Sequence, residues 1–321
     1  MNFIDYPRFV PYRCYEAARA EMTEKLRRQP GVKAIFQIGS IRHPGISDLD
    51  LEVVFEDTAE CRMNPLAHLS KSERYIFSHG LYGTKISHFL KARRLSFFHN
   101  YVPLWGEKYP AGEPALTDEE TKILKTQIAL EYLLKMYVNT VVDSAYRLIK
   151  VRALLLQTKA LLYDLEFLDV TSGRLMDLIK TVVSWRDQWF EKTPNPGTLR
   201  SWHDRFFEEL TVFLRDIFRS RTLFFSPKKE YRMTKNVVLF RAQELKYFRR
   251  GPTFPPQLSR LGKKYFNLQH RFNTFRIGVP AEEHPIPSIV EQMLLLNKSM
   301  REHHRDRLPF FQPLTSSLIL L

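Results

Sequence analysis

The stretch FQIGSIRHPGISDLDLEVVF, residues 36–55, decides the fold. It begins inside an apolar segment, Val32–Ile38, whose composition is typical of a buried strand. The turn-forming residues IRHPGIS follow, and Asp48–Phe55 then has the composition of a second strand that ends in three apolar residues. We therefore expect two neighbouring strands joined by a loop that begins at Gly39.

A helix is expected before the first of these strands. Residues 15–29 contain neither Gly nor Pro, and they place Ala17, Met22 and Leu26 at helical spacings. The dipeptide Pro30-Gly31 then ends the segment, since neither residue favours continuing a helix. The order helix, strand, loop, strand follows.

The region after residue 56 has a less regular pattern. It predicts helices near Lys71–His79 and Thr84–Arg93. Leu95–His99 is apolar and aromatic enough for a third strand, which would close against Tyr101–Trp105. The Pro- and Gly-containing segment 109–114 reads as a linker.

A helical domain is predicted after this linker. Thr117 and Glu120 have the spacing of a capping box, in which each side chain bonds an unpaired amide at a helix start. Neither Gly nor Pro occurs from Thr117 to Phe167, where apolar residues recur at steps of three and four. Further helices are expected at Arg174–Glu191, Leu199–Arg219, Thr234–Arg249 and Ser288–Arg305.

The paired acids Asp48 and Asp50 are the strongest candidates for chemistry. Side chains alternate along a strand, so both carboxylates project from one face. A hard divalent cation such as Mg²⁺ relieves their repulsion and can hold nucleotide phosphates at the same time. Gly39 allows close approach of the backbone to a phosphate, and the Ser40 hydroxyl can donate a hydrogen bond to it.

Ile38-Gly39-Ser40, followed after seven residues by Asp48-Leu49-Asp50, resembles the signature of the nucleotidyltransferase superfamily related to DNA polymerase beta. The likeness covers roughly residues 15–110. Residues 130–162 look like the helical bundle that follows the catalytic domain in small kanamycin-type nucleotidyltransferases. The resemblance implies an α/β nucleotidyltransferase-like domain with a small mixed sheet at residues 1–114, followed by an all-α helical domain at residues 115–321.

The activity implied is transfer of a nucleoside monophosphate from a nucleoside triphosphate to a hydroxyl acceptor. By this resemblance, Asp48 and Asp50 bind Mg²⁺ or Mn²⁺, and Gly39 and Ser40 cradle the phosphates. Arg42 lies in the loop that would border the triphosphate, so its guanidinium is a candidate partner for a phosphate oxygen. The acceptor is left open between an RNA end, a protein side chain and a small molecule.

One departure from the family pattern concerns a third carboxylate. Family members that act through two metals carry one on the strand equivalent to residues 95–100, where this chain has Ser96, His99 and Asn100. Three explanations remain: the third strand lies elsewhere, another acid such as Glu52 or Glu107 substitutes, or the site binds nucleotide without turnover. The last alternative makes the chain a catalytically degenerate nucleotidyltransferase that serves as an RNA-binding or scaffold subunit. A glycosyltransferase with a metal-binding Asp-x-Asp is a further alternative, which the Gly-Ser turn disfavours.

The charge of +14 is unevenly distributed along the 321 residues. Residues 1–116 carry a net charge of +3, and the remainder carries +11. Such a surplus attracts a polyanion, and RNA is the candidate partner that it favours. Basic residues are interleaved with aromatic ones at 228–232, 246–250 and 263–266, as in grooves for single-stranded nucleic acid.

The cysteine content and hydropathy indicate a soluble, cytoplasmic protein without a membrane partner. Two cysteines are too few for a disulfide framework. The N-terminus has Asp5, Pro7 and Pro11 where a signal peptide needs an apolar run. No apolar run reaches the roughly 18 residues that a membrane span requires.

Overall fold

The strands predicted around the Gly-Ser turn lie in a small mixed sheet. The computed structural model describes residues 1–97, 100–109, 115–225, 230–280 and 284–315. The strands are β2 (Val32–Ile38), β3 (Asp50–Phe55), β4 (Tyr82–Lys85) and β5 (Val102–Gly106), in the order β4-β3-β2-β5. β2 runs antiparallel to β3 and β5, whereas β3 and β4 are parallel.

The chain divides into two compact units. The first unit comprises Arg8–Thr121 and residues from Glu291 onward, and it contains this sheet. The second unit comprises Met1–Pro7 and Lys122–Val290. The long helix α9 (Ser288–Arg307) begins at the boundary, and the chain after it returns to the first unit, where Gln312 forms a parallel bridge with Tyr82.

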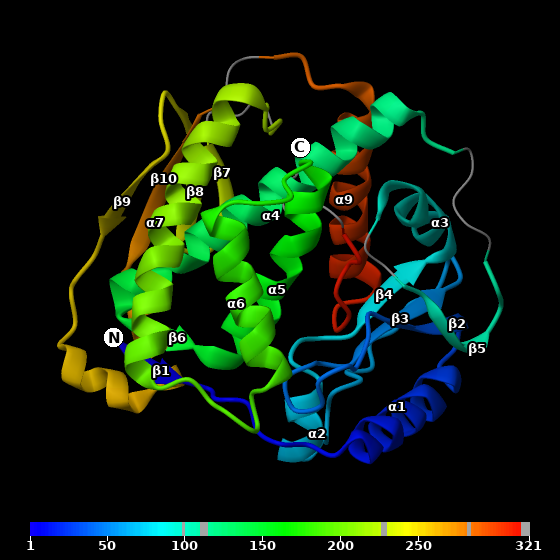
Figure 1. The fold of residues 1–321 in the computed structure, drawn as a ribbon. Helices are drawn as coiled ribbons and strands as arrows, with labels where there is room; N and C mark the ends of the chain where they lie inside the picture. The colour runs from blue at the N-terminus through cyan, green and yellow to red at the C-terminus, as the bar shows by residue number, and fades with distance from the viewer. Residues whose placement is uncertain (98–99, 110–114, 226–229, 281–283, 316–321) are drawn as a thin grey trace. The chain divides into compact units, whose positions relative to one another are not determined.

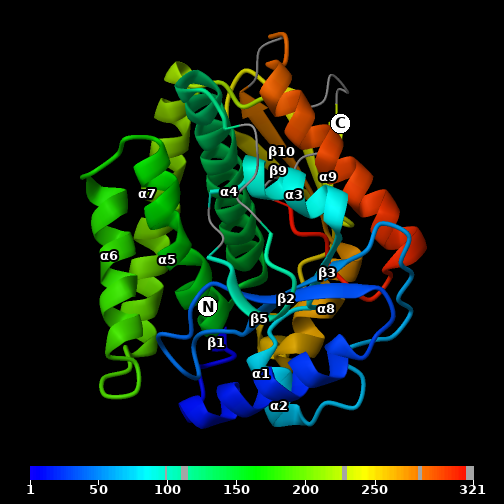
Figure 2. The same ribbon diagram turned by 90° about the vertical axis from the view of Figure 1, so that its right-hand side faces the viewer.

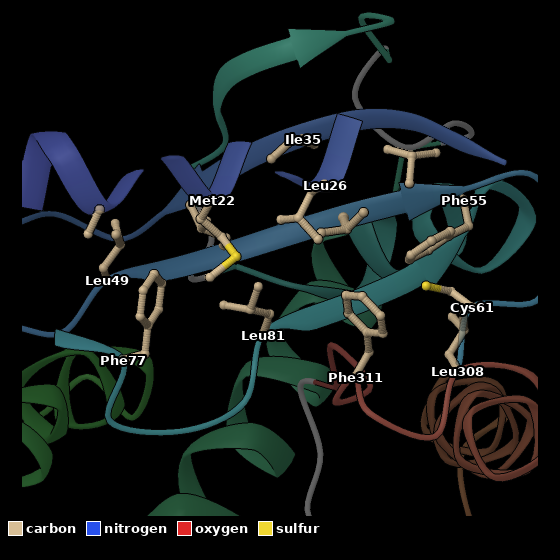
Figure 3. Close-up of a cluster of buried hydrophobic side chains, with 14 of the residues drawn as sticks. Met22, Leu26, Ile35, Leu49, Phe55, Cys61, Phe77, Leu81, Leu308 and Phe311 are labelled. Carbon is tan, nitrogen blue, oxygen red and sulfur yellow. The ribbon is translucent and has the colours of Figure 1, made fainter. Parts of the chain in front are cut away.

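Alternation along β3 sends its side chains to two different layers of the first unit. Leu51, Val53 and Phe55 belong to one buried cluster with Met22 and Leu26 of α1 (Tyr12–Arg27). Figure 3 shows Phe55, Met22 and Leu26 in this cluster. The opposite face meets α3 (Ile86–Leu95), so helices cover both faces of the sheet (Figures 1 and 2). The short helix α2 (Lys71–Ile76) begins at a capping box on Ser70.

The predicted third strand at Leu95–His99 was misplaced. Leu95 ends α3 instead, because Phe89, Ala92 and Leu95 continue one buried stripe at helical spacing. On the side away from β3, β2 pairs with β5. The residues of β5 were expected only to close against the predicted third strand. Phe98 and His99 lie outside the described residues. The helix predicted at Thr84–Arg93 starts later, because Thr84 belongs to β4.

Helices form most of the second unit. They are α4 (Asp118–Tyr146), α5 (Val151–Phe167), α6 (Arg174–Asp187), α7 (Pro196–Ser220) and α8 (Lys263–Phe272), with a 3-10 turn at Pro256–Leu261. Figures 1 and 2 show α5, α6 and α7 side by side. The capping box predicted for α4 is confirmed: Thr117 N donates to Glu120 Oε2 at 2.9 Å, and Glu120 N donates to Thr117 Oγ1 at 3.2 Å.

The second unit is not all-α, contrary to the prediction. It contains a sheet with the order β7-β8-β10-β9, formed by Glu230–Thr234, Val237–Ala242, Thr274–Pro280 and Lys246–Arg250. The helix predicted at Thr234–Arg249 is wrong because buried Val237 and Leu239 alternate with half-buried neighbours, which is the period of a strand.

A second interruption separates α4 from α5. Arg147 has φ of +54°, and β6 (Leu148–Lys150) then pairs in parallel with β1 (Asn2–Ile4). The uninterrupted helical pattern of the sequence did not reveal this break, because both flanking segments lack Gly and Pro. Among the helices that the structure describes, none has the length and apolar character needed to cross a membrane.

Candidate functional site

The Gly-Ser turn brings the backbone of Gly39 next to the first acid of β3. Ile38 at the end of β2 is paired with Asp50. Gly39 has φ of +72°, a conformation that glycine adopts without strain. A Cβ placed on it would lie 3.9 Å from Asp50 Oδ2. Ser40 and Arg42 are exposed beyond this turn, where a ligand can reach them.

Two tyrosines hold the loop between the turn and Asp48. Tyr15 of α1 donates its hydroxyl proton to Ser47 O at 2.7 Å and accepts a hydrogen bond from Gly45 N at 2.9 Å. Tyr75 of α2 donates to Gly45 O at 2.6 Å. Because Ser47 immediately precedes Asp48, these contacts fix the position of Asp48.

Asp48, Asp50 and His79 form a group that could hold a metal ion, since one ligand atom from each lies within 4.8 Å of the others. His79 Nε2 is 2.8 Å from Asp50 Oδ1 and 3.8 Å from Asp48 Oδ2. Ser78 Oγ donates a hydrogen bond to Asp48 Oδ2. The two predicted acids therefore converge, and an imidazole that the sequence did not suggest stands between them.

The electrostatics of the group favour a protonated His79. Burial opposes the charged imidazolium, but the hydrogen bond and charge of Asp50, the carbonyl of Gly80 and the charge of Asp48 outweigh it and raise the pKa of His79 to about 9. His79 Nδ1 lies 2.7 Å from Gly80 O and donates to it in this state. Burial raises the pKa of Asp50, and His79 opposes that shift. The imidazolium of His79 therefore already offsets part of the negative charge of Asp48 and Asp50.

Parallel pairing explains why His79 reaches the acids. β3 and β4 begin at the same edge of the sheet, so Asp50 at the start of β3 and His79 just before β4 are neighbours. The sequence interpretation placed His79 at the end of a helix, which in fact ends at Ile76. The useful signal was the strand Tyr82–Lys85, which was interpreted as the start of a helix.

Glu52 does not extend the acidic group. It lies on the same strand face as Asp50, but it is fully buried and neither carboxyl oxygen has a hydrogen-bond partner among the described residues. Burial raises the pKa of Glu52 to about 8, so its carboxyl is largely protonated at neutral pH. Glu107 follows β5 and accepts a hydrogen bond from Tyr109 Oη at 2.9 Å.

No third carboxylate joins Asp48 and Asp50 in the part of the chain that the structure describes. His79 is instead the third member of the group. Of the three explanations for the missing carboxylate, substitution by Glu52 or Glu107 is not supported, since neither belongs to the metal-capable group.

The basic and aromatic segment at β9 lies at an edge of the second unit's sheet. Tyr247 and Phe248 are 45% and 54% exposed, and Arg250 is also exposed. Arg249 is occupied structurally, because its Nε donates to Asn273 Oδ1 at 2.7 Å and its remaining nitrogens donate to two backbone carbonyls. Arg250 is therefore the better candidate for a nucleic acid contact.

Comparison with known proteins does not identify the chain: no family model matches it, and a search of curated proteins finds no similar sequence. The function of the chain is therefore inferred from the geometry of the site.

Proposed function

We propose that the chain is a metal-dependent nucleotidyltransferase that transfers a nucleoside monophosphate from a nucleoside triphosphate to a hydroxyl acceptor. The observation that carries the proposal is the convergence of Asp48, Asp50 and His79 next to the Gly39 backbone. Metal ligands and a close backbone approach for phosphate then lie side by side, as this chemistry requires.

The donor atoms fit a divalent cation. Two carboxylates suit Mg²⁺ or Mn²⁺, and the imidazole of His79 shifts the preference toward Mn²⁺, since Mg²⁺ strongly prefers oxygen ligands. When bound, such an ion neutralises the charge that develops on the phosphoryl oxygens. His79 would have to lose a proton before its Nε2 could become a ligand, because the imidazolium has no free lone pair.

The residues around the turn would orient the triphosphate. Gly39 leaves space beside its backbone, and the exposed Ser40 hydroxyl and Arg42 guanidinium would donate hydrogen bonds to phosphate oxygens. The acceptor oxygen would attack the α-phosphorus while the bond to pyrophosphate breaks. The acceptor's proton would pass to solvent, because Nε2 of His79 would have no free lone pair while it is a metal ligand. Positioning and charge neutralisation would supply most of the rate enhancement.

The acceptor class follows only from charge. The +11 surplus beyond residue 116 favours RNA over a neutral small molecule or a protein side chain. Exposed Tyr247, Phe248 and Arg250 on β9 supply the rings and the cation that single-stranded RNA needs.

A second candidate function is a degenerate nucleotidyltransferase that binds RNA or partners without turnover. The observation that favours it is His79 itself, because an imidazolium 2.8 Å from Asp50 already neutralises the acids that would bind a metal. On this alternative, divalent cations compete poorly for the site.

The two functions are separated by measuring binding and transfer on the same protein. The full chain is tested by thermal shift with ATP, CTP, GTP or UTP and Mg²⁺ or Mn²⁺, and then with α-labelled nucleotides and total RNA or cell lysate. The first function predicts a shift and label transfer, both lost in Asp50→Asn. Glu56→Gln, a surface acid paired with Lys33, is the matched control. Nucleotide binding without transfer would support the second function, and no shift with any nucleotide would contradict the first.

A further inference from the structure

A cavity of about 150 Å³ lies within the second unit. Its lining residues come from α4, β6, α5, α7 and α8, all between Met136 and Phe266. Aromatic side chains, including Phe266, form part of the wall, and the rest is a mixture of aliphatic and polar side chains. A cavity of this size accommodates a molecule at least as large as benzene, or several waters.

Two buried polar side chains that line the cavity lack hydrogen-bond partners. His203 of α7 is 3% exposed, and its Nε2 makes no hydrogen bond to any described residue. Its Nδ1 is 3.6 Å from Asp204 Oδ1, which is longer than a hydrogen bond. Thr158 of α5 is fully buried, and its Oγ1 has no partner among the described residues. Buried polar groups left unpaired are costly, so a ligand that bonds them would be stabilising.

Two opposite charges face the same cavity without pairing. Asp143 of α4 and Lys150 of β6 both line it, and no ion pair within 4.0 Å joins these two described residues. Lys150 Nζ instead lies 3.8 Å from the ring centre of Phe266. Burial raises the pKa of Asp143 to about 7 and lowers the pKa of Lys150. The attraction between the two groups opposes both shifts without cancelling them, so neither charge is fully compensated.

We propose that this cavity binds a small zwitterion of amino-acid size, with its ammonium group at Asp143 and its carboxylate at Lys150. The two charges of the site sum to zero, so a zwitterion neutralises both of them, whereas a polyol neutralises neither. His203 Nε2 and Thr158 Oγ1 supply hydrogen bonds to the remaining polar atoms of the ligand. The proposal is independent of the nucleotide site, because every residue it uses lies in the second unit.

The first experiment identifies the ligand class. The full chain is mixed separately with each of the twenty proteinogenic amino acids, and with glycerol, erythritol and myo-inositol, and the Tm is measured. At least one amino acid should raise the Tm by about 2 °C or more at a concentration well above its Kd. No shift with any amino acid, or a shift with the polyols alone, would overturn the proposal.

The second experiment tests the two charge contacts with matched ligands. Calorimetry should show that Asp143→Asn weakens the amino acid at least about tenfold but leaves its N-acetyl derivative, which has no ammonium group, unaffected. Lys150→Met should weaken the amino acid but not its methyl ester, which has no carboxylate. Lys159→Met, which removes a cation of α5 outside the cavity lining, should bind normally.

The wild-type chain provides a test that does not depend on the folding of any variant. The N-acetyl derivative and the methyl ester should each bind it at least about tenfold more weakly than the parent amino acid. Equal affinity for all three ligands would overturn the proposal, as would variants that weaken every ligand alike.

Discussion

Asp50 at the sheet edge of the first unit and Asp164 inside the second unit are stabilised in opposite ways. Asp50 faces a cation, with His79 Nε2 at 2.8 Å. Asp164 of α5 is 2% exposed, its Oδ1 has no hydrogen-bond partner among the described residues, and burial raises its pKa to about 8. The first acid is held as one partner of an ion pair, and the second is buried as a neutral carboxyl.

This difference shows that burial alone does not decide whether an acid can serve chemistry. Desolvation favours the neutral form in both places. At Asp50 the hydrogen-bonded His79 opposes it, whereas at Asp164 a backbone hydrogen bond and the charge of Lys135 oppose it and still leave the pKa at about 8. A divalent ion can replace that cation, because the acids there retain access to solvent from the Gly39 turn. No such replacement by a divalent ion is available to Asp164 on α5. Changing Asp164 is therefore expected to affect the stability of the fold.

The largest effect should come from removing one charge at the strand end. Asp50→Asn should lower nucleotidyl transfer by about 10³-fold or more, because a ligand to the charge-neutralising ion is lost. Label transfer from an α-labelled triphosphate measures it, with Glu56→Gln as the control. An Asp50→Asn variant with normal transfer would place the chemistry elsewhere and remove the contrast between the two regions.

The next effect concerns the acid inside the second unit and its pH dependence. The folded-state pKa of Asp164 is about 8, against 3.8 for an ordinary Asp, so the folded state retains a proton that the unfolded state has released. Its contribution to stability is complete below pH 4 and is lost as the pH rises through 8. Asp164→Asn should remove this loss, which amounts to about 4 kcal/mol between about pH 5 and pH 9.

Urea unfolding at the two pH values measures this difference. Glu208→Gln, at an exposed position on α7, is the control and should keep the wild-type pH dependence. Equal pH slopes for wild type and Asp164→Asn would mean that Asp164 is charged in the folded state. The two regions would then not differ in the way that the burial of Asp164 indicates.

A smaller effect is expected when the cation between the acids is exchanged for an acid. His79→Asp would place a third carboxylate beside Asp48 and Asp50 and remove a nitrogen donor. The ratio of transfer with Mg²⁺ to transfer with Mn²⁺ should rise about tenfold, since Mg²⁺ prefers oxygen ligands. His79→Asn, which supplies oxygen without charge, is the matched variant. An unchanged ratio in both variants would show that His79 does not approach the metal.

Sequence reasoning was most successful where the residues of a feature are close together in the chain. β2, the segment that contains β3, and the capping box of α4 could be predicted because strand period and capping chemistry are local. Asp48 and Asp50 could be paired for the same reason. His79 could not, because only the parallel pairing of β4 with β3 brings it there, and register between distant strands leaves no local signal.

The same distinction applies to the second unit. Its cavity combines Asp143, Lys150, Thr158 and His203 from four separate elements, and no spacing in the sequence joins them. Its sheet was missed because the apolar residues of β8 were fitted to a helical period, although Val237 and Leu239 alternate with their neighbours. Helices found by long periodic segments, such as α7, were predicted within a few residues of their ends.

The smallest effect is expected from replacing an exposed cation on β9. Arg250 is exposed at the end of β9, beside exposed Phe248, whereas Arg249 is held by hydrogen bonds within the unit. If the second unit binds single-stranded RNA, Arg250→Glu should reduce the slope of log affinity against log salt by about 1 to 2, because fewer counterions are released. Arg62→Glu, at an exposed position of the first unit, should leave the slope unchanged.

A uridine-rich oligonucleotide titrated at several salt concentrations measures the slope for both variants. Equal loss in the two variants would indicate that overall charge, and not the β9 surface, attracts the RNA, and binding that ignores salt would exclude a polyanion surface on either unit.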